Sequence, residues 1–249
     1  MNVIVNAFLI GILSLGGDSA AVRGQTAERL IHRYIDAVGG QTRLESIQTL
    51  IVETIGTRPG REGETHTTTY LKRPNLARIE SSSSGRPGMR MTYDGKNIFF
   101  TSGIPVPPDS PMAARIRRNV NIYQNFGSLI DSRGGDFKAE YLGRDRVEGT
   151  STERVKITYA DGFQRELDFE GSTGLLIRTQ EKDEQGRIHS SIFSDFRSVK
   201  GLKFSFKQKN IGPLPDDPNG ITLIDTISIR LNEPIEDDFF RPDEDTIKK

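Results

Sequence analysis

The sequence contains no cysteine and no tryptophan, and it has only three histidines, His32, His66 and His189. Without cysteine the chain has no disulfide, no thiol nucleophile, no cysteine-ligated zinc or iron–sulfur cluster, and no cysteine that carries a lipid. Three scattered histidines also nearly exclude a histidine-rich metal centre. We therefore expect neither a metal nor a cofactor.

The chain also has no net charge, because its 249 residues include 34 Lys and Arg side chains and 34 Asp and Glu side chains. Binding to nucleic acid or to an anionic membrane surface needs a basic excess or a basic stripe. The balance argues against nucleic acid as the main partner. Hydrophobic residues make up 34% of the chain, which suits a large antiparallel sheet with one solvated face.

Patterns typical of catalysis are lacking too. The acidic clusters Asp216-Asp217, Glu236–Asp238 and Asp243–Asp245 could form a glycosidase carboxylate pair or a calcium loop, but neither their spacing nor nearby glycines support this. A nucleophile elbow and a His–acid pairing are absent from the sequence. We interpret the clusters as solvated turns and tail, predict no catalytic residues, and expect that the protein is not an enzyme.

Long hydrophobic runs are scarce, and only Val3–Leu15 near the N-terminus stands out. Ser19-Ala20-Ala21 follows it and fits the small-residue rule for signal cleavage after Ala21, with cleavage after Gly24 as the alternative. We interpret residues 1–24 as a signal peptide and expect a mature chain in the periplasm. Because Met1-Asn2 carries no positive charge, an N-terminal helix packed on the domain is the other interpretation.

The mature chain is expected to be a single domain, residues 25–249, that begins with a helix over 26–38. Apolar residues recur there at helical spacing, and Gly39-Gly40 ends the helix. The members of the apolar stripe are Leu30, Ile31, Tyr34, Ile35 and Val38.

From Thr49 onwards the apolar period changes to two, and short turns separate a series of predicted strands. Asp94-Gly95 is typical of a two-residue hairpin loop; that loop would set Met91 opposite Ile98 and Met89 opposite Phe100, all on one apolar face. At Ala160–Gly162 the hydrophobic pattern favours a three-residue loop instead, with Tyr159 opposite Phe163. Such a series of hairpins predicts a mainly β (α+β) fold, an antiparallel meander that curls towards a barrel.

Two charged residues interrupt apolar faces of this meander. Arg165 lies between Phe163 and Leu167, and Asp225 shares a face with Leu223 and Ile227. An unpaired buried charge is costly, so each needs a partner, water or a cavity mouth. Structural ion pairs or contacts to an anionic head group are the two interpretations.

One helical insertion, about residues 105–132, interrupts the strands. Asp109 or Ser110 can cap a helix whose first turn contains Pro111. Its apolar side is formed by Ile116, Val120, Tyr123, Phe126, Leu129 and Ile130, and its basic side by Arg115, Arg117 and Arg118. The apolar side either completes the core or covers a ligand cavity as a lid.

The segments Lys72–Leu76 and Tyr93–Phe100 resemble the LolA lipoprotein carrier family, which has a KRPN-like strand start followed by a DGK hairpin. The resemblance implies a curved, open antiparallel half-barrel with a leading helix and an inserted helical lid over a hydrophobic cavity. It assigns lid gating to Arg73 and points Ala77, Ile79 and Ser81 inward. LolA itself has a large aromatic residue at the position of Ile79.

With this resemblance, the cavity is expected to be lined by strand and lid residues: Ile79, Met89, Met91, Ile98, Phe100, Ile116, Val120 and Tyr123. Arg165 and Asp225 are candidate head-group contacts. The implied function is a monomeric periplasmic carrier of lipoprotein acyl chains or a related lipid, which would meet protein partners of the inner or outer membrane. The alternative is a lipid-sensing module that regulates a protein partner, as in RseB-like proteins.

Overall fold

The computed structural model describes residues 18–84, 86–101, 104–124, 137–214 and 216–242. Its helices are α1 (Asp18–Val38), α2 (Gln41–Glu45), α3 (Pro111–Gln124) and the 3-10 helix η1 (Asp237–Phe240). Its strands are β1 (Thr49–Thr57), β2 (Thr65–Lys72), β3 (Leu76–Ser83), β4 (Arg86–Tyr93), β5 (Ile98–Phe100), β6 (Phe137–Val147), β7 (Thr150–Tyr159), β8 (Gln164–Glu170), β9 (Leu176–Lys182), β10 (Ile188–Val199), β11 (Leu202–Leu214) and β12 (Asp217–Leu231).

All twelve strands form one antiparallel sheet in the order β5-β4-β3-β2-β1-β12-β11-β10-β9-β8-β7-β6. The chain runs from the central β1 out to the edge strand β5 and reappears, after α3, in β6 at the opposite edge. It then returns strand by strand to β12, which pairs with β1. The predicted mainly β fold, an open antiparallel sheet with a leading helix and an inserted helix, is confirmed.

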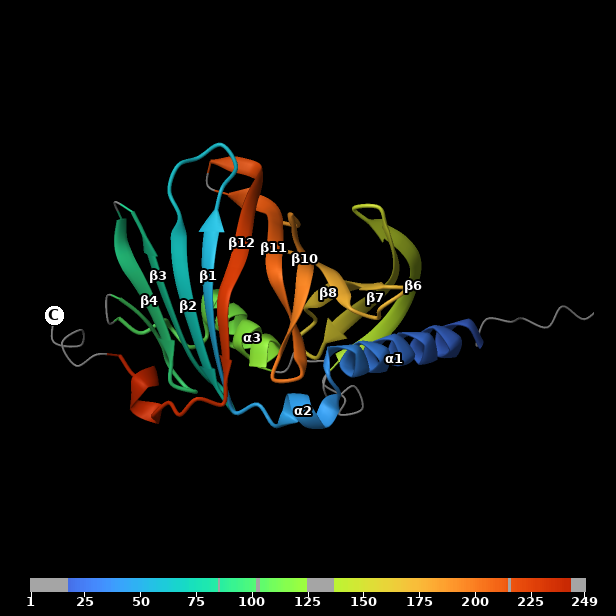
Figure 1. Ribbon diagram of the computed structural model, residues 1–249, viewed down its shortest axis with the longest axis horizontal. Coiled ribbons are helices and arrows are strands. Elements are labelled where there is room, and N and C mark those ends of the chain that lie inside the picture. Colours follow the sequence, from blue (N-terminus) through green and yellow to red (C-terminus); the bar gives the residue numbers. More distant parts are fainter. Residues whose placement is uncertain (1–17, 85, 102–103, 125–136, 215, 243–249) are drawn as a thin grey trace, which may run out of the picture.

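The sheet is bent around α3 (Figure 1). The α3 residues Ile116 and Val120 pack on a cluster that includes Leu71 of β2, while Arg118 of α3 contacts the β7–β8 hairpin at Asp161. Because β2 and β8 are six strand spacings apart in the sheet order, they would lie about 29 Å apart in a flat sheet. Helix α3 can contact both β2 and the β7–β8 hairpin because the sheet curls and brings these strands closer together.

Two apolar clusters lie on the face of the sheet that carries α1 and α3, which we call the inner face. The first joins α1 to β6–β8, β11 and the end of β12, and contains Ile31, Val155, Leu167, Phe169 and Leu231 among others. The second joins α3 to β2–β5. Leu50 of β1 packs against both, so the inner face is apolar from one half of the sheet to the other.

Helix α1 contains the predicted helix 26–38 and buries the predicted stripe. It ends at Gly39, whose φ of 132° is accessible mainly to glycine. A Cβ at Gly39 would lie 2.7 Å from the carbonyl oxygen of Gly201. Glycine is thus required both for the backbone conformation and for the close approach of α1 to the β10–β11 turn.

The opposite, outer face is covered at one end of β2 and β3 by η1. Phe240 is fully buried, and Phe239 packs edge-on against Tyr70 with ring centroids 4.8 Å apart. The guanidinium of Arg78 lies 4.3 Å from the Phe239 ring and donates to the Phe239 carbonyl oxygen. The C-terminal segment therefore protects this part of the outer face from water.

The predicted register of the hairpin at Asp94-Gly95 is wrong. Met91 pairs with Phe100 and Tyr93 with Ile98, so the loop has four residues, 94–97. The Asp94 carboxylate accepts hydrogen bonds from the N–H groups of Lys96 and Asn97, which stabilises the longer turn. The observed register differs from the predicted one by two residues. Since side chains alternate with a period of two, Met89, Met91, Ile98 and Phe100 still share one face.

The three-residue loop at Ala160–Gly162 is confirmed. Val155 pairs with Leu167 and Ile157 with Arg165, and the N–H of Tyr159 donates to the carbonyl oxygen of Phe163. Gly162 has the expected positive φ of 82°. The hydrophobic pattern was sufficient here because only one register buries both strands on the same side.

The apolar face predicted for Leu223, Asp225 and Ile227 is interrupted in β12. A bulge at Ile227 shifts the pairing with β1, since Glu53 pairs with Ser228 and Thr54 with Thr226. Ile229 and Leu231 face the inner side, whereas Leu223 and Asp225 on the other side of the bulge face outward. One extra residue moves every following side chain to the opposite face.

Candidate functional site

Six of the eight predicted cavity residues come together in the cluster between α3 and the inner face. Ile98 and Met91 are buried, Val120 of α3 is buried against them, and the other three pack at the border of the cluster. Those three are Ile79, Phe100 and Ile116. Ile79 therefore lies on the side of the sheet that faces α3, as expected.

Strand register explains how these residues meet. Cross-strand pairing aligns two rows that are two residues apart along the strands. One row contains Val52, Thr69, Ile79, Met91 and Phe100, and the other contains Leu50, Leu71, Ala77, Tyr93 and Ile98. Side chains in alternate rows share one face of a sheet. Leu71 and Tyr93 were absent from the predicted set, although period-two alternation with Ala77 could have found them.

Helix α3 presents its apolar side to these rows. Ala113 is fully buried, and Ile116 and Val120 follow it at helical spacing. Ser110 is the cap, since its Oγ accepts the N–H of Ala113 at 3.2 Å. The predicted lid residues 125–131 lie outside the part of the chain that the structure describes, as does the side chain of Tyr123.

Met89 lies one row further along the same face and is 48% exposed. That row is otherwise formed by Thr54, Thr67 and Ser81, and the hydroxyl oxygens of Thr67 and Ser81 are 3.0 Å apart. The inner face of β1–β4 thus changes from apolar beneath α3 to hydroxyl-bearing beyond it. Such a surface suits an amphiphilic ligand with an apolar part and a polar part.

Arg73 lies directly after β2, and its described side-chain hydrogen bonds reach one main-chain carbonyl within α2 and one between α2 and β1. Its Nε donates to the oxygen of Ile47 at 2.7 Å and its Nη2 to that of Leu44 at 3.5 Å. Partial burial lowers the pKa of the guanidinium, with Glu45 acting in the opposite direction. Leu44 belongs to α2 and Ile47 lies just after it, so the described hydrogen bonds of Arg73 reach α2 and not the predicted lid helix.

Arg165 lies on the inner face, in register with the fully buried Ile157. Its Nη2 lies 3.0 Å from the carboxylate of Glu181, and its side chain is only 15% exposed. Burial raises the pKa of the neighbouring Tyr159, and Arg165 partly opposes this effect. The partner that a buried charge requires is thus present, and Arg165 remains a candidate contact for a head group.

Asp225 lies on the outer face because of the β12 bulge. It is 55% exposed, and its carboxylate lies 3.7 Å from the ammonium of Lys207. The structure therefore separates Asp225 from Arg165 and from the apolar cluster.

Arg118 was predicted only as part of the basic side of the insertion, yet it joins α3 to the other half of the sheet. Its Nη2 lies 2.8 Å from the carboxylate of Asp161, and its guanidinium carbon lies 4.2 Å from the centre of the Phe163 ring. The sequence contains no local signal for this contact, because Arg118 and Asp161 are 43 residues apart in the chain.

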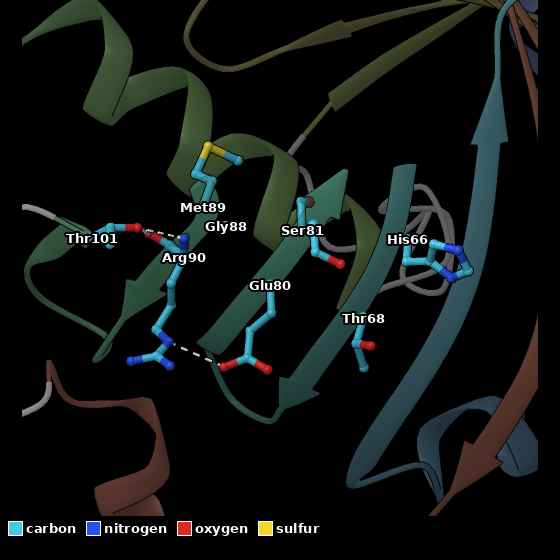
Figure 2. Close-up of a pocket in the computed structure, with 9 residues that line it drawn as sticks. His66, Thr68, Glu80, Ser81, Gly88, Met89, Arg90 and Thr101 are labelled. Atoms are coloured by element: carbon cyan, nitrogen blue, oxygen red, sulfur yellow. Dashed lines mark hydrogen bonds and ion pairs between the residues drawn. The ribbon is translucent and has the colours of Figure 1, made fainter. Parts of the chain in front are cut away.

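A shallow polar trough of about 400 Å³ lies on β2–β4 (Figure 2). Figure 2 shows Thr68, Glu80 and Arg90 on one side of the strands, and Ser81 and Met89 on the side of α3. The Glu80 carboxylate is paired with both Arg90 and Arg78. Met89 has the one apolar side chain among the described residues that line this trough, so the trough offers mainly charged and hydroxyl groups and little of the apolar lining that an acyl chain needs.

The described residues contain neither a membrane-spanning helix nor a cluster of metal ligands. No helix in this part of the chain is long and apolar enough to cross a membrane. Within the same residues, no group of three or more His, Asp or Glu side chains could hold a metal ion.

Comparisons with known proteins find relatives by structure and not by sequence. No protein-family model and no curated protein sequence matches the chain. A solved structure of a DUF1329 family protein from Desulfovibrio piger has 16% identity and a TM-score of 0.59, over 88% of this chain and 97% of that one. A LolA superfamily protein from Nitrosomonas europaea has 13% identity and a TM-score of 0.59, over 87% of this chain and 98% of that one. The curved sheet and the inserted helix of this chain therefore form a LolA-like fold.

Proposed function

We propose that this protein is a periplasmic, non-enzymatic carrier that binds lipoprotein acyl chains or a related lipid between α3 and the inner face of the sheet. The observation that supports this most directly is the continuous apolar inner face beneath a separate helix, with hydroxyl groups beyond it. An acyl chain inserted there would contact the apolar rows beneath α3, while the polar part of the ligand meets Thr54, Thr67 and Ser81.

The energetics support an apolar ligand. Removing one CH₂ group from water contributes about 0.8 kcal/mol, so ten such groups contribute roughly 8 kcal/mol before the costs of ordering and of moving the helix. The apolar cluster also contains Met91, whose flexible side chain adapts to chains of different shape. The LolA superfamily likeness is one of fold alone, and it agrees with a ligand on this face.

The first test asks whether lipid is bound at all. Native mass spectrometry of protein purified from the periplasm should detect a co-purifying lipid or acylated peptide. Emptied protein should then bind a fluorescent fatty acid such as cis-parinaric acid. If neither occurs, the proposed function is wrong.

The second test locates the site through the variant Ile79→Asn. A polar amide in the inner-face row should weaken binding of the fluorescent fatty acid by about tenfold, because it adds a desolvation cost to the occupied site. The matched control is Glu80→Gln, the next residue, which points to the outer face. Circular dichroism at rising temperature checks that both variants fold, and equal weakening by both would contradict this location.

A further inference from the structure

Helix α3 is attached to the two halves of the sheet by different kinds of contact. Towards β2–β5 it presents the buried Ala113 and Val120, together with the half-buried Ile116. Towards the β7–β8 hairpin, the described contact is made by Arg118 with Asp161 and Phe163. The first attachment is apolar and buried, and the second is polar and partly solvated.

We infer that ligands reach the inner face between α3 and the β7–β8 hairpin, and that Arg118 is the positioning residue that holds this side closed. The inference rests on the proposed function. It adds the route of access and the residue that controls it.

The exposure of each contact to water determines whether α3 separates first from β2–β5 or from the β7–β8 hairpin. The Arg118 side chain is 24% exposed and that of Asp161 is 49% exposed, so water and salt ions reach their ion pair. Separating Ala113 and Val120 from the sheet would instead expose apolar surface that is now buried. Displacement of α3 should therefore begin at Arg118, with the helix remaining on β2–β5.

Local hydrogen bonding and ring stacking hold the β7–β8 hairpin residues that contact the Arg118 guanidinium in place. The Asp161 carboxylate accepts the N–H of Phe163 at 3.0 Å, which holds the side chain within the turn. Burial opposes ionisation of Asp161, but this bond and Arg118 lower the pKa of the carboxyl overall. The Phe163 ring also stacks on Tyr159, with ring centroids 5.7 Å apart.

The same hairpin leads from the surface to the apolar interior. Phe163 stacks on Tyr159, whose ring centroid lies 6.2 Å from that of Phe137. Both Tyr159 and Phe137 pack against the buried cluster beneath α1. An acyl chain that enters beside Arg118 would therefore meet aromatic surface continuously from the opening to the inner face.

The first experiment measures whether Arg118 holds α3, independently of any ligand. Hydrogen exchange of residues 111–124 should become at least threefold faster in Arg118→Ala than in the natural protein. The matched control is Arg115→Ala, which removes a neighbouring exposed arginine of the same helix. Arg118→Lys should be intermediate, because it keeps the charge and loses the planar fork. Unchanged exchange in Arg118→Ala would overturn the inference.

The second experiment measures access to the inner face by stopped-flow association of cis-parinaric acid. Arg118→Ala should associate severalfold faster than the natural protein. Salt should accelerate association of the natural protein by screening the ion pair, and Arg118→Ala should lose this acceleration. Because the chain has no cysteine, Arg118→Cys with Asp161→Cys can be joined specifically by a cleavable bismaleimide. The bridge should slow association at least tenfold, and its cleavage should restore the rate.

The outcomes separate the two proposals. If the natural protein binds the probe and neither the bridge nor Arg118→Ala changes the rate, access by this route is wrong while the proposed function stands. If exchange in α3 responds to Arg118→Ala but the natural protein never binds the probe, the proposed function is wrong, and the route of access with it.

Discussion

Single residues in this protein tolerate unusual environments when their neighbours on adjacent strands compensate. Asp168 is fully buried although it is a carboxylate. Cross-strand pairing places Arg154 and Arg178 on either side of it, and both donate to its oxygens, at 3.1 and 2.7 Å. A buried charge is retained only with such partners, because removing it from water alone costs several kcal/mol.

Tyr34 gives a prediction for alkaline pH. Burial against Phe169 raises the pKa of its phenol to about 12, whereas the unfolded phenol titrates near its ordinary value of 10. The native state therefore holds this proton more tightly. Its contribution is fully present below about pH 10 and should be lost between about pH 10 and 12, lowering the free energy of unfolding by roughly 2–3 kcal/mol.

Urea unfolding of the natural protein and of Tyr34→Phe at several pH values in this range checks the prediction. The variant has no phenol at this position, so its free energy of unfolding should fall less steeply with pH. Identical slopes would show that Tyr34 ionises as easily in the native state as in the unfolded chain.

At the scale of elements, Arg73 connects the end of β2 to the segment between α2 and β1. The resemblance assigns it a role in moving the lid, and the described hydrogen bonds hold the carbonyls of Leu44 and Ile47. Arg73→Leu should leave the fold intact but lower stability by about 1–3 kcal/mol, since hydrogen bonds to charged groups are worth about that much. Arg73→Lys should recover only part of the loss.

Hydrogen exchange resolved by segment measures what Arg73 holds in place. Faster exchange in both 44–48 and 111–124, together with altered release of bound lipid, would support lid gating. Faster exchange confined to 44–48, with unchanged lipid transfer, would mean that Arg73 only stabilises the junction before β1.

At the scale of the whole molecule, the two halves of the sheet meet at β1 and β12, and α1 and α3 cover one half each. Alpha-helix α1 begins at Asp18, within the predicted signal peptide 1–24. Among the α1 residues whose burial the structure describes, Ala27 is the first that is fully buried, and Arg23 is exposed. Removal of residues 1–24 therefore leaves the buried contacts of α1 from Ala27 onwards in place.

This placement leads to a prediction about export. Protein recovered from the periplasm should begin at residue 22 or 25, as read by mass spectrometry of its N-terminal peptide. A chain expressed from residue 25 should melt within about 2 °C of the exported protein, because it keeps Ala27 and the buried α1 residues that follow it. A chain expressed from residue 32 lacks Ala27, Leu30 and Ile31 and should fail to fold. An exported protein with residues 1–24 still attached would contradict the signal peptide.

The sequence alone was sufficient to identify the fold class, helix 26–38, the Ala160–Gly162 loop, and six residues that share the cluster under α3. Each of these follows from local periodicity, a turn residue or a family motif, which act over a few neighbouring positions. Tertiary structure decided the four-residue loop at 94–97, the bulge that turns Asp225 outward, and the contact of Arg118 with Asp161. A side-chain hydrogen bond sets the first and one unpaired residue sets the second. The third exists only because a sheet of twelve strands bends until its distant members reach the same helix.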